Sequence, residues 1–158
     1  MELTAAVLII SDSCANGTRQ DLSGPALRRA LEAKGFRITA QEVVPDQREI
    51  ISRKLQELAK QARFVVTTGG TGIAPRDVTP EATRAICDRL LDGVSELMRA
   101  EGLKQTPLAP LSRGVCGTLG KSLLLNLPGN PNGAEQSLNA VLHLVPHALE
   151  LLDGKTAH

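Results

Sequence analysis

Residues 64–83 constrain the fold more than any other stretch, because they join a strand, a glycine-rich turn and a helix start in one continuous run. Phe64–Thr67 is uncharged and mostly β-branched, which is typical of a buried strand. Gly69–Gly72 then holds three glycines in four residues, so the backbone can adopt positive φ and present main-chain N–H groups to a ligand. Thr79–Glu81 is a predicted helix start, with a capping threonine followed by proline.

Two charged residues, Arg76 and Asp77, lie between these glycines and the predicted helix. A strand, a glycine turn and a helix N-terminus together form an arrangement that binds phosphate. An arginine and a carboxylate beside it would supply a phosphate clamp and a metal ligand. The same residues also fit a tight turn that carries a solvated ion pair. Glycine loops are common, so the local pattern leaves both interpretations open.

Strands and helices alternate along the rest of the chain. The predicted strands cover residues 4–10, 36–44, 64–67, 111–117 and 122–127, and the predicted helices cover 25–34, 47–61, 80–91, 94–101 and 134–152. Gly93 is expected to break the chain between two helices, and Pro146 is expected to kink the last one. This alternation predicts an α/β fold: a three-layer sandwich with a mostly parallel sheet and helices on both faces. We expect residues 1–158 to form a single domain.

Ligands of such sheets bind at the carboxyl ends of the strands. We therefore expect four segments to gather at one edge: Ser11–Ser13, Asp46, Gly69–Asp77 and Asn126–Asn130. Each also has a structural interpretation, because Asp46 suits a helix cap with Glu49 and the serines suit a hydrogen-bonded turn. The second glycine-containing turn, residues 128–133, is likewise a plausible strand-to-helix connection. Ser112 and Arg113 suit a solvated pair on an edge strand.

Composition argues against several classes of partner and site. The formal net charge is +1, the chain has no Trp or Tyr, and no apolar run reaches membrane-spanning length, so we expect neither nucleic acid nor a membrane as partner. Three widely spaced cysteines and an N-terminus without a secretion signal predict free thiols in the cytoplasm. Gly120-Lys121-Ser122 is not a phosphate-binding loop, because Val115 replaces the required glycine and a strand follows. His143 and His147 lack a nearby carboxylate at ligand spacing.

Four motifs occur in order along nearly the whole chain: SDSCANGTRQDLSGP near the start, VPD at 44–46, TTGGTGIAPRDVTPEAT at 67–83 and LNLPGNPNG at 125–133. Together they make the chain resemble the molybdopterin adenylyltransferases, a family that includes the G domains of gephyrin and its plant counterpart. The resemblance implies molybdenum cofactor biosynthesis, in which AMP is transferred from ATP to the terminal phosphate of molybdopterin and pyrophosphate is released.

The resemblance also implies roles for individual residues. Asp77 and Asp46 are expected to be catalytic and to hold Mg²⁺, while ATP and molybdopterin are the substrates. Nucleotide or phosphate contacts are expected from Gly69, Gly70, Thr71, Gly72, Asp12 and Ser13. Molybdopterin contacts are expected from Ser112, Arg113, Asn126, Pro128, Gly129 and Asn130. The family further implies a homotrimer and a molybdenum-insertion enzyme as a partner.

Two other functions remain open from the sequence. The family often has an acidic residue after Asp46, but this chain has Gln47, which leaves room for a relative that only binds molybdopterin or serves as a scaffold. A pyrophosphatase that cleaves dinucleotides such as ADP-ribose would share the glycine turn, as in proteins similar to the competence-damage family. The PRDVTPEAT stretch and the short chain favour the transferase.

Overall fold

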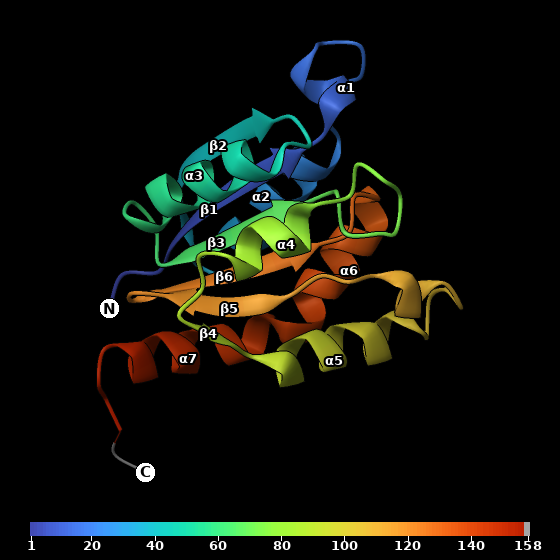
Figure 1. Ribbon diagram of the computed structural model, residues 1–158. Helices are drawn as coiled ribbons and strands as arrows, with labels where there is room; N and C mark the ends of the chain where they lie inside the picture. The colour runs from blue at the N-terminus through green and yellow to red at the C-terminus, as the bar shows by residue number, and fades with distance from the viewer. Residues whose placement is uncertain (157–158) are drawn as a thin grey trace.

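The computed structural model describes residues 1–156, and a six-stranded sheet forms its centre (Figure 1). The strands are β1 (Thr4–Ile10), β2 (Arg37–Val44), β3 (Phe64–Thr68), β4 (Arg89–Leu90), β5 (Cys116–Leu119) and β6 (Ser122–Leu127). Their order across the sheet is β2-β1-β3-β6-β5-β4. β2, β1, β3 and β6 pair in parallel, whereas β5 is antiparallel to both of its neighbours. The mostly parallel sheet is therefore confirmed.

Helices cover both faces of this sheet. They are α1 (Asp12–Ala15), α2 (Ser23–Ala33), α3 (Arg48–Ala59), α4 (Thr79–Arg84), α5 (Asp92–Gly102), α6 (Pro131–Val141) and α7 (Val145–Leu152), with short 3₁₀ turns at Ala109–Leu111 and Leu142–Leu144. In Figure 1, α3 and α4 lie in front of the sheet, while α2 and α6 lie behind it. Among the helices of residues 1–156, none combines the length and the apolar character that crossing a bilayer requires.

Two hydrophobic cores follow from the alternation of side chains along each strand. In β1, Ala5, Val7 and Ile9 belong to the core that packs against α2, α5, α6 and α7. Ala6 and Leu8 belong to the opposite core, which packs against α3 and α4. Every residue of β1 is buried, as expected for a parallel strand covered on both faces. The predicted three-layer arrangement with helices on both faces is thus confirmed.

Several predicted boundaries were wrong. The predicted helix at 80–91 ends at Arg84, because residues 89–90 form the edge strand β4. β5 covers residues 116–119 rather than 111–117, and it is an inner strand. Gly93 lies inside α5 instead of breaking the chain. The last predicted helix is divided by the 3₁₀ turn Leu142–Leu144, so Pro146 falls in the first turn of α7, where its missing N–H costs nothing.

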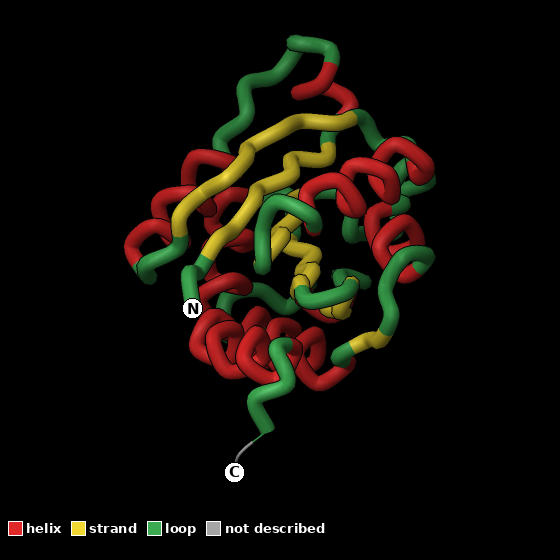
Figure 2. The backbone as a smooth tube through the Cα atoms, turned by 90° about the vertical axis from the view of Figure 1, so that its left-hand side faces the viewer, coloured by secondary structure: helices red, strands yellow, loops and turns green. Residues whose placement is uncertain are grey.

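The parallel strands all end at the same side of the sheet. Figure 2 looks onto the opposite side, where the chain begins and where α7 ends. The connections after β1, β2, β3 and β6 therefore meet away from both termini, at the right of Figure 1. This edge carries the candidate site.

Candidate functional site

Two cavities open at this edge of the sheet. The smaller cavity, about 380 Å³, is lined by the ends of β1 and β3, by Asp46 and Asp77, and by Gly129–Pro131. The larger cavity, about 810 Å³, lies beside α5 and α6 and is lined partly by Ser112 and Pro128. Asn130 lines both cavities, so the two hollows adjoin at the start of α6.

The turn after β3, residues 69–78, is called the first elbow. Gly69 and Gly70 both have positive φ, of 104° and 67°, which L side chains rarely adopt. A Cβ at Gly69 would overlap the carbonyl oxygen of Ile10, so this position also needs glycine for close packing against β1. Gly70 lines the smaller cavity, and its N–H donates to no acceptor within residues 1–156. The first elbow can therefore offer a backbone donor to an anion.

Thr79, predicted as the cap of α4, has a different role. The cap position is Val78, which makes no side-chain capping bond. The Thr79 hydroxyl instead donates to the carbonyl oxygen of Gly69 at 2.9 Å, and its N–H donates to the carbonyl oxygen of Gly70 at 3.2 Å. The start of α4 is thus used to fold the first elbow back onto the helix. Phosphate binding by the N-terminus of this six-residue helix is not supported.

Asp12 and Asp46 bind each other's backbone. The Asp46 carboxylate accepts the N–H of Asp12 at 2.9 Å, and the Asp12 carboxylate accepts the N–H of Asp46 at 3.0 Å. These bonds tie the ends of β1 and β2 together. The predicted capping role of Asp46 was wrong, because Gln47 occupies the cap position of α3 and no side-chain capping bond forms.

Arg76 reaches from the first elbow to the same pair. Its Nε and Nη2 donate to the two carboxylate oxygens of Asp12 at 3.0 and 2.8 Å. This bidentate pairing, together with the bond from the Asp46 N–H, holds the pKa of the Asp12 carboxyl below its usual value. Arg76 is therefore occupied by Asp12 in this structure, and it does not line either cavity.

Asp46 has the opposite pKa shift. Burial raises the pKa of its carboxyl, and repulsion from Asp12 and Asp77 raises it further, while the Asp12 N–H and Arg76 oppose the shift. The carboxyl groups of Asp46 and Asp77 both line the smaller cavity, so its wall carries acidic side chains. A cation bound there would stabilise the ionised form of Asp46.

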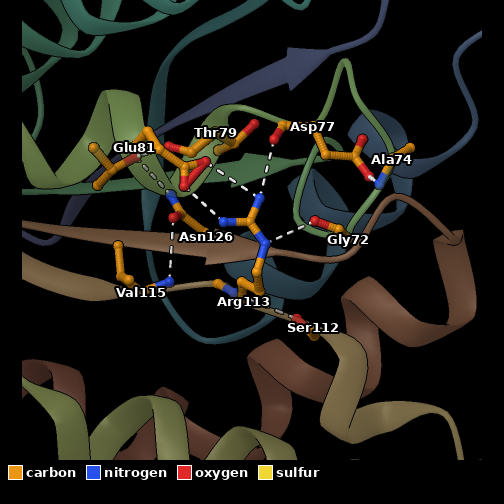
Figure 3. Close-up of polar contacts among 11 residues, drawn as sticks. Gly72, Ala74, Asp77, Thr79, Glu81, Ser112, Arg113, Val115 and Asn126 are labelled. Atoms are coloured by element: carbon orange, nitrogen blue, oxygen red, sulfur yellow. Dashed lines mark hydrogen bonds and ion pairs between the residues drawn. The ribbon is translucent and has the colours of Figure 1, made fainter.

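Asp77 lies on the first elbow and faces the smaller cavity. Its Oδ2 accepts the N–H of Ala74 at 3.0 Å, and its N–H donates to the carbonyl oxygen of Ala74 at 2.9 Å (Figure 3). A Cβ on Gly72 would lie 2.9 Å from the same carboxylate oxygen, so glycine leaves room for the side chain. The loop thus fixes the carboxylate and leaves its other oxygen available.

The carboxylates of Asp46 and Asp77 suit Mg²⁺ only when substrate phosphates supply further ligands. Among the described residues, no three His, Cys, Asp or Glu side chains converge to enclose a metal. Asp46 and Asp77 line the smaller cavity from the segments after β2 and β3, and one or two carboxylates are what Mg²⁺ commonly takes when substrate phosphates complete its shell. Asp21 also lines this cavity, but its Oδ1 accepts the Gly24 N–H at 3.0 Å. The donor set therefore suits a magnesium ion that arrives with a nucleotide, rather than a resident metal.

The second elbow, residues 128–133, packs directly on the first. The Thr68 hydroxyl donates to the Pro128 carbonyl oxygen at 2.8 Å, and the Gly69 N–H donates to the Leu127 carbonyl oxygen at 3.1 Å. A Cβ on Gly129 would lie 3.3 Å from the Gly69 Cα. The predicted gathering of both elbows at one edge, beside the two carboxylates, is confirmed.

The larger cavity differs chemically from the smaller one. It is lined mainly by neutral hydrogen-bonding side chains and apolar groups from the start of α6, the end of α5 and the segment between Gln105 and Ser112. Its amide side chains are Gln105, Asn130, Asn132, Gln136 and Asn139. Amides donate and accept at once, which suits a neutral heterocycle with both kinds of group.

Some predicted site residues lie outside both cavities, namely Asp12, Ser13, Thr71, Gly72, Arg113 and Asn126. Asn126 is 1% exposed, and its amide group binds Thr67, Thr83 and the N–H of Val115. The Asn126 side chain therefore joins three elements inside the protein, and this geometry does not support its predicted contact with molybdopterin. Ser13 is also displaced, because the short helix α1, which was not predicted, places Ser11 and Cys14 in the smaller cavity instead.

The sequence reasoning also missed residues that line the smaller cavity. Arg19 and Gln20 follow α1 and lie at its wall. Among the described residues that line the smaller cavity, Arg19 is the one Lys or Arg, so it can offer positive charge to a phosphate there. Its position in a polar loop after a central strand, within the motif SDSCANGTRQDLSGP, was the available signal.

Comparison with known proteins agrees with this geometry. Residues 6–147 match the family model for the probable molybdopterin binding domain. Molybdopterin adenylyltransferase of Helicobacter pylori is 41% identical over 152 residues, covering 94% of this chain and 86% of that protein. The molybdenum cofactor synthesis protein cinnamon of Drosophila melanogaster is 40% identical over 153 residues, but the chain spans only 26% of its length.

A solved structure gives a similar result. The molybdopterin biosynthesis enzyme MoaB from Thermus thermophilus superimposes with a TM-score of 0.90 and is 48% identical. The superposition covers 97% of this chain and 98% of that one. The two chains therefore share a fold along almost their whole lengths.

Proposed function

The chain belongs to the molybdopterin-binding domain family, and we propose that it is a molybdopterin adenylyltransferase that acts in molybdenum cofactor biosynthesis. In this reaction an oxygen of the terminal phosphate of molybdopterin attacks the α-phosphorus of ATP. The bond from that phosphorus to the oxygen bridging to the β-phosphate breaks, and pyrophosphate leaves. The product is adenylyl-molybdopterin.

Adenylyl transfer to molybdopterin does not require a strongly basic side chain. A phosphate monoester has a second pKa of about 6, so the attacking group is mostly ionised near neutral pH and no strong base is needed. What the protein must do is bring two anions together and offset their repulsion. The lining of the smaller cavity carries this proposal, because Gly70, whose N–H has no acceptor among the described residues, lines it together with Asp46 and Asp77.

The two cavities divide the substrates between them. We assign the ATP phosphates to the smaller cavity, which has the Gly70 N–H, the carboxylates of Asp46 and Asp77, and the Arg19 side chain at its wall. The pterin is assigned to the larger cavity, where Ser112 and Pro128 lie among amide side chains. Asn130 lines both, so the reacting phosphates would meet beside the second elbow.

Asp46 and Asp77 would hold Mg²⁺ together with the nucleotide phosphates. When bound, the ion would offset charge on those phosphates. The chain's own residues supply the rest: the Gly70 N–H orients a phosphate oxygen, and the bonds between Asp12 and Asp46 keep one carboxylate at the cavity wall. The homotrimer and the molybdenum-insertion partner belong to the same proposal and rest on family resemblance. The cytoplasmic location also belongs to it and rests on the widely spaced cysteines.

The direct experiment incubates the protein with ATP, Mg²⁺ and molybdopterin, and follows pyrophosphate and adenylyl-molybdopterin by mass spectrometry. Equal amounts of both products are expected. Tight molybdopterin binding without a product would instead identify a binding-only relative. Release of AMP from ADP-ribose, tested in parallel, would identify a dinucleotide pyrophosphatase.

A further inference from the structure

Arg113 lies in the segment between α5 and β5, yet its polar contacts are almost all with the first elbow and α4 (Figure 3). Its N–H donates to the Thr71 carbonyl oxygen at 2.8 Å, and its Nε donates to the Gly72 carbonyl oxygen at 2.9 Å. Its Nη2 donates to the Asp77 carbonyl oxygen at 3.0 Å. Arg113 therefore binds the backbone at residues 71–72 and at Asp77, on both sides of the loop that carries the Asp77 carboxylate.

Glu81 of α4 fixes the guanidinium in this position. The Arg113 Nη1 donates to Oε2 of Glu81 at 2.6 Å, and Nη2 donates to Oε1 at 3.2 Å. These bonds hold the pKa of the Glu81 carboxyl below its usual value. The pairing is bidentate and only about a third exposed, at 35% for Arg113 and 34% for Glu81, so its geometry is well defined. The loop is thereby anchored to a helix as well as to the segment before β5.

The neighbours of Arg113 belong to the other cavity. Ser112 lines the larger cavity, and so does Arg99 of α5, whose Nη1 donates to the Ser112 and Gly114 carbonyl oxygens at 3.4 and 3.2 Å. Arg113 itself lines neither cavity. Arg99 thus holds the backbone on both sides of Arg113 at the wall of the larger cavity, and Arg113 in turn binds the backbone of Asp77.

We infer that Arg113 is a positioning residue. It fixes the loop that carries Asp77 relative to the wall of the larger cavity, and it does not bind molybdopterin directly. This inference rests on the proposed function. It replaces the ligand contact expected from the sequence, because the Arg113 donors point at carbonyl oxygens and at Glu81. Lysine cannot substitute, since a single ammonium cannot reach two separate carbonyls and a bidentate carboxylate together.

The test is a double-mutant cycle with Arg113→Lys and Asp77→Ala, and Arg28→Lys serves as control because Arg28 forms only an exposed pair with Glu32. Arg113→Lys should lower kcat by about 10²-fold, the usual cost of a small misplacement of a reacting group. The KM for molybdopterin should change less than about 2-fold, because no ligand contact is lost. In the Asp77→Ala background, Arg113→Lys should have almost no further effect.

Three results would overturn the inference. These are wild-type kcat in Arg113→Lys, a large rise in the KM for molybdopterin with kcat unchanged, or an equal fold-loss in both backgrounds, which a purely structural role would produce. Hydrogen exchange over residues 71–77 tests the inference without the reaction. Exchange should be faster in Arg113→Lys than in wild type and unchanged in Arg28→Lys. If the wild type transfers no AMP, the proposed function fails, and unchanged exchange in Arg113→Lys would separately refute the positioning role.

Discussion

The first elbow and the second elbow touch each other, but they are held in place by different means. The first elbow needs positive φ at Gly69 and Gly70. A local bond from Thr79 and long-range bonds from Arg76 and Arg113 fix the rest. The second elbow runs directly into α6, where the Asn130 side chain caps the helix by accepting the Gly133 N–H at 3.0 Å.

Under the proposed function, this difference separates the elbow that carries Asp77 from the elbow that lines both cavities. Under the proposed function, the Asp77 carboxylate on the first elbow must be placed within a fraction of an ångström, and Arg113 from outside the elbow holds its loop. The second elbow is an ordinary capped helix start that forms a wall for both cavities. Changes to the first elbow should therefore lower kcat, whereas changes to the second should have a smaller effect on kcat.

The largest effect is expected from Asp77→Ala. Removing a carboxylate that would hold the charge-offsetting Mg²⁺ should lower adenylyl transfer by about 10²- to 10³-fold, and the fold should be retained because the side chain is only half-buried on a loop. Pyrophosphate release and far-UV circular dichroism measure the two outcomes. Asp92→Ala is the control, since Asp92 is exposed at the start of α5. Equal turnover of the Asp77 and Asp92 variants would refute the catalytic assignment.

A matched pair of glycine substitutions sharpens the comparison between the elbows. In Gly70→Ala, the added Cβ would require positive φ and would press on Thr79 and Asp46. We expect a loss of about 1–2 kcal/mol in the free energy of unfolding and a clear fall in kcat. In Gly129→Ala, φ is not positive, so the unfolding free energy should change by less than about 1 kcal/mol. Urea denaturation checks both, and similar losses in the two variants would contradict the distinction.

A smaller effect is expected at the cap of α6. Asn130→Ala removes the bond to the Gly133 N–H and should lower the free energy of unfolding by about 1 kcal/mol. Asn132→Ala in the first turn of the same helix is the matched control and should be close to neutral. The comparison uses urea midpoints at constant m-value. If Asn132→Ala proved the more damaging variant, the capping role of Asn130 would be wrong.

The smallest effect is a pH dependence of stability with opposite signs at two carboxyls. The folded-state pKa of Asp46 is raised, so the unfolded chain ionises first, at about pH 4, and Asp46 lowers stability as the pH rises through that value to the folded pKa. The folded-state pKa of Asp12 is lowered, so its contribution is present above about pH 4 and is lost as the pH falls through the folded pKa.

Asp46→Asn isolates the first of these contributions, because it keeps an oxygen that can accept the Asp12 N–H. Its stability relative to wild type should increase as the pH rises above about 4, measured by urea denaturation over that range. A difference that is independent of pH, or that decreases with pH, would contradict the raised pKa of Asp46.

The sheet was largely predictable because its information is local. Thr4–Ile10 and Ser122–Leu127 are apolar runs of strand length, and the stripe on α3 repeats at helical spacing. The gathering of strand ends followed from topology alone, since parallel strands place their carboxyl ends together. The boundaries after α4 failed because the pairing of β4 with β5 is a tertiary contact that local propensity does not report.

The site was less predictable for the same physical reason. The bonds of Arg113 to Glu81 and of Arg76 to Asp12 join residues 32 and 64 positions apart, so no local sequence pattern predicts them. The family resemblance implied a ligand contact for Asn126, yet its side chain donates to the hydroxyls of Thr67 in β3 and Thr83 in α4. Which face a strand-end side chain occupies depends on packing partners that sequence spacing does not identify.

The most direct test is a crystal structure with ATP and Mg²⁺ bound. The account predicts density for the phosphates in the smaller cavity, with a phosphate oxygen about 3 Å from the Gly70 nitrogen. It also predicts a metal ion that contacts the carboxylates of Asp46 and Asp77. Phosphate density confined to the larger cavity, or at a site that touches neither carboxylate, would contradict it.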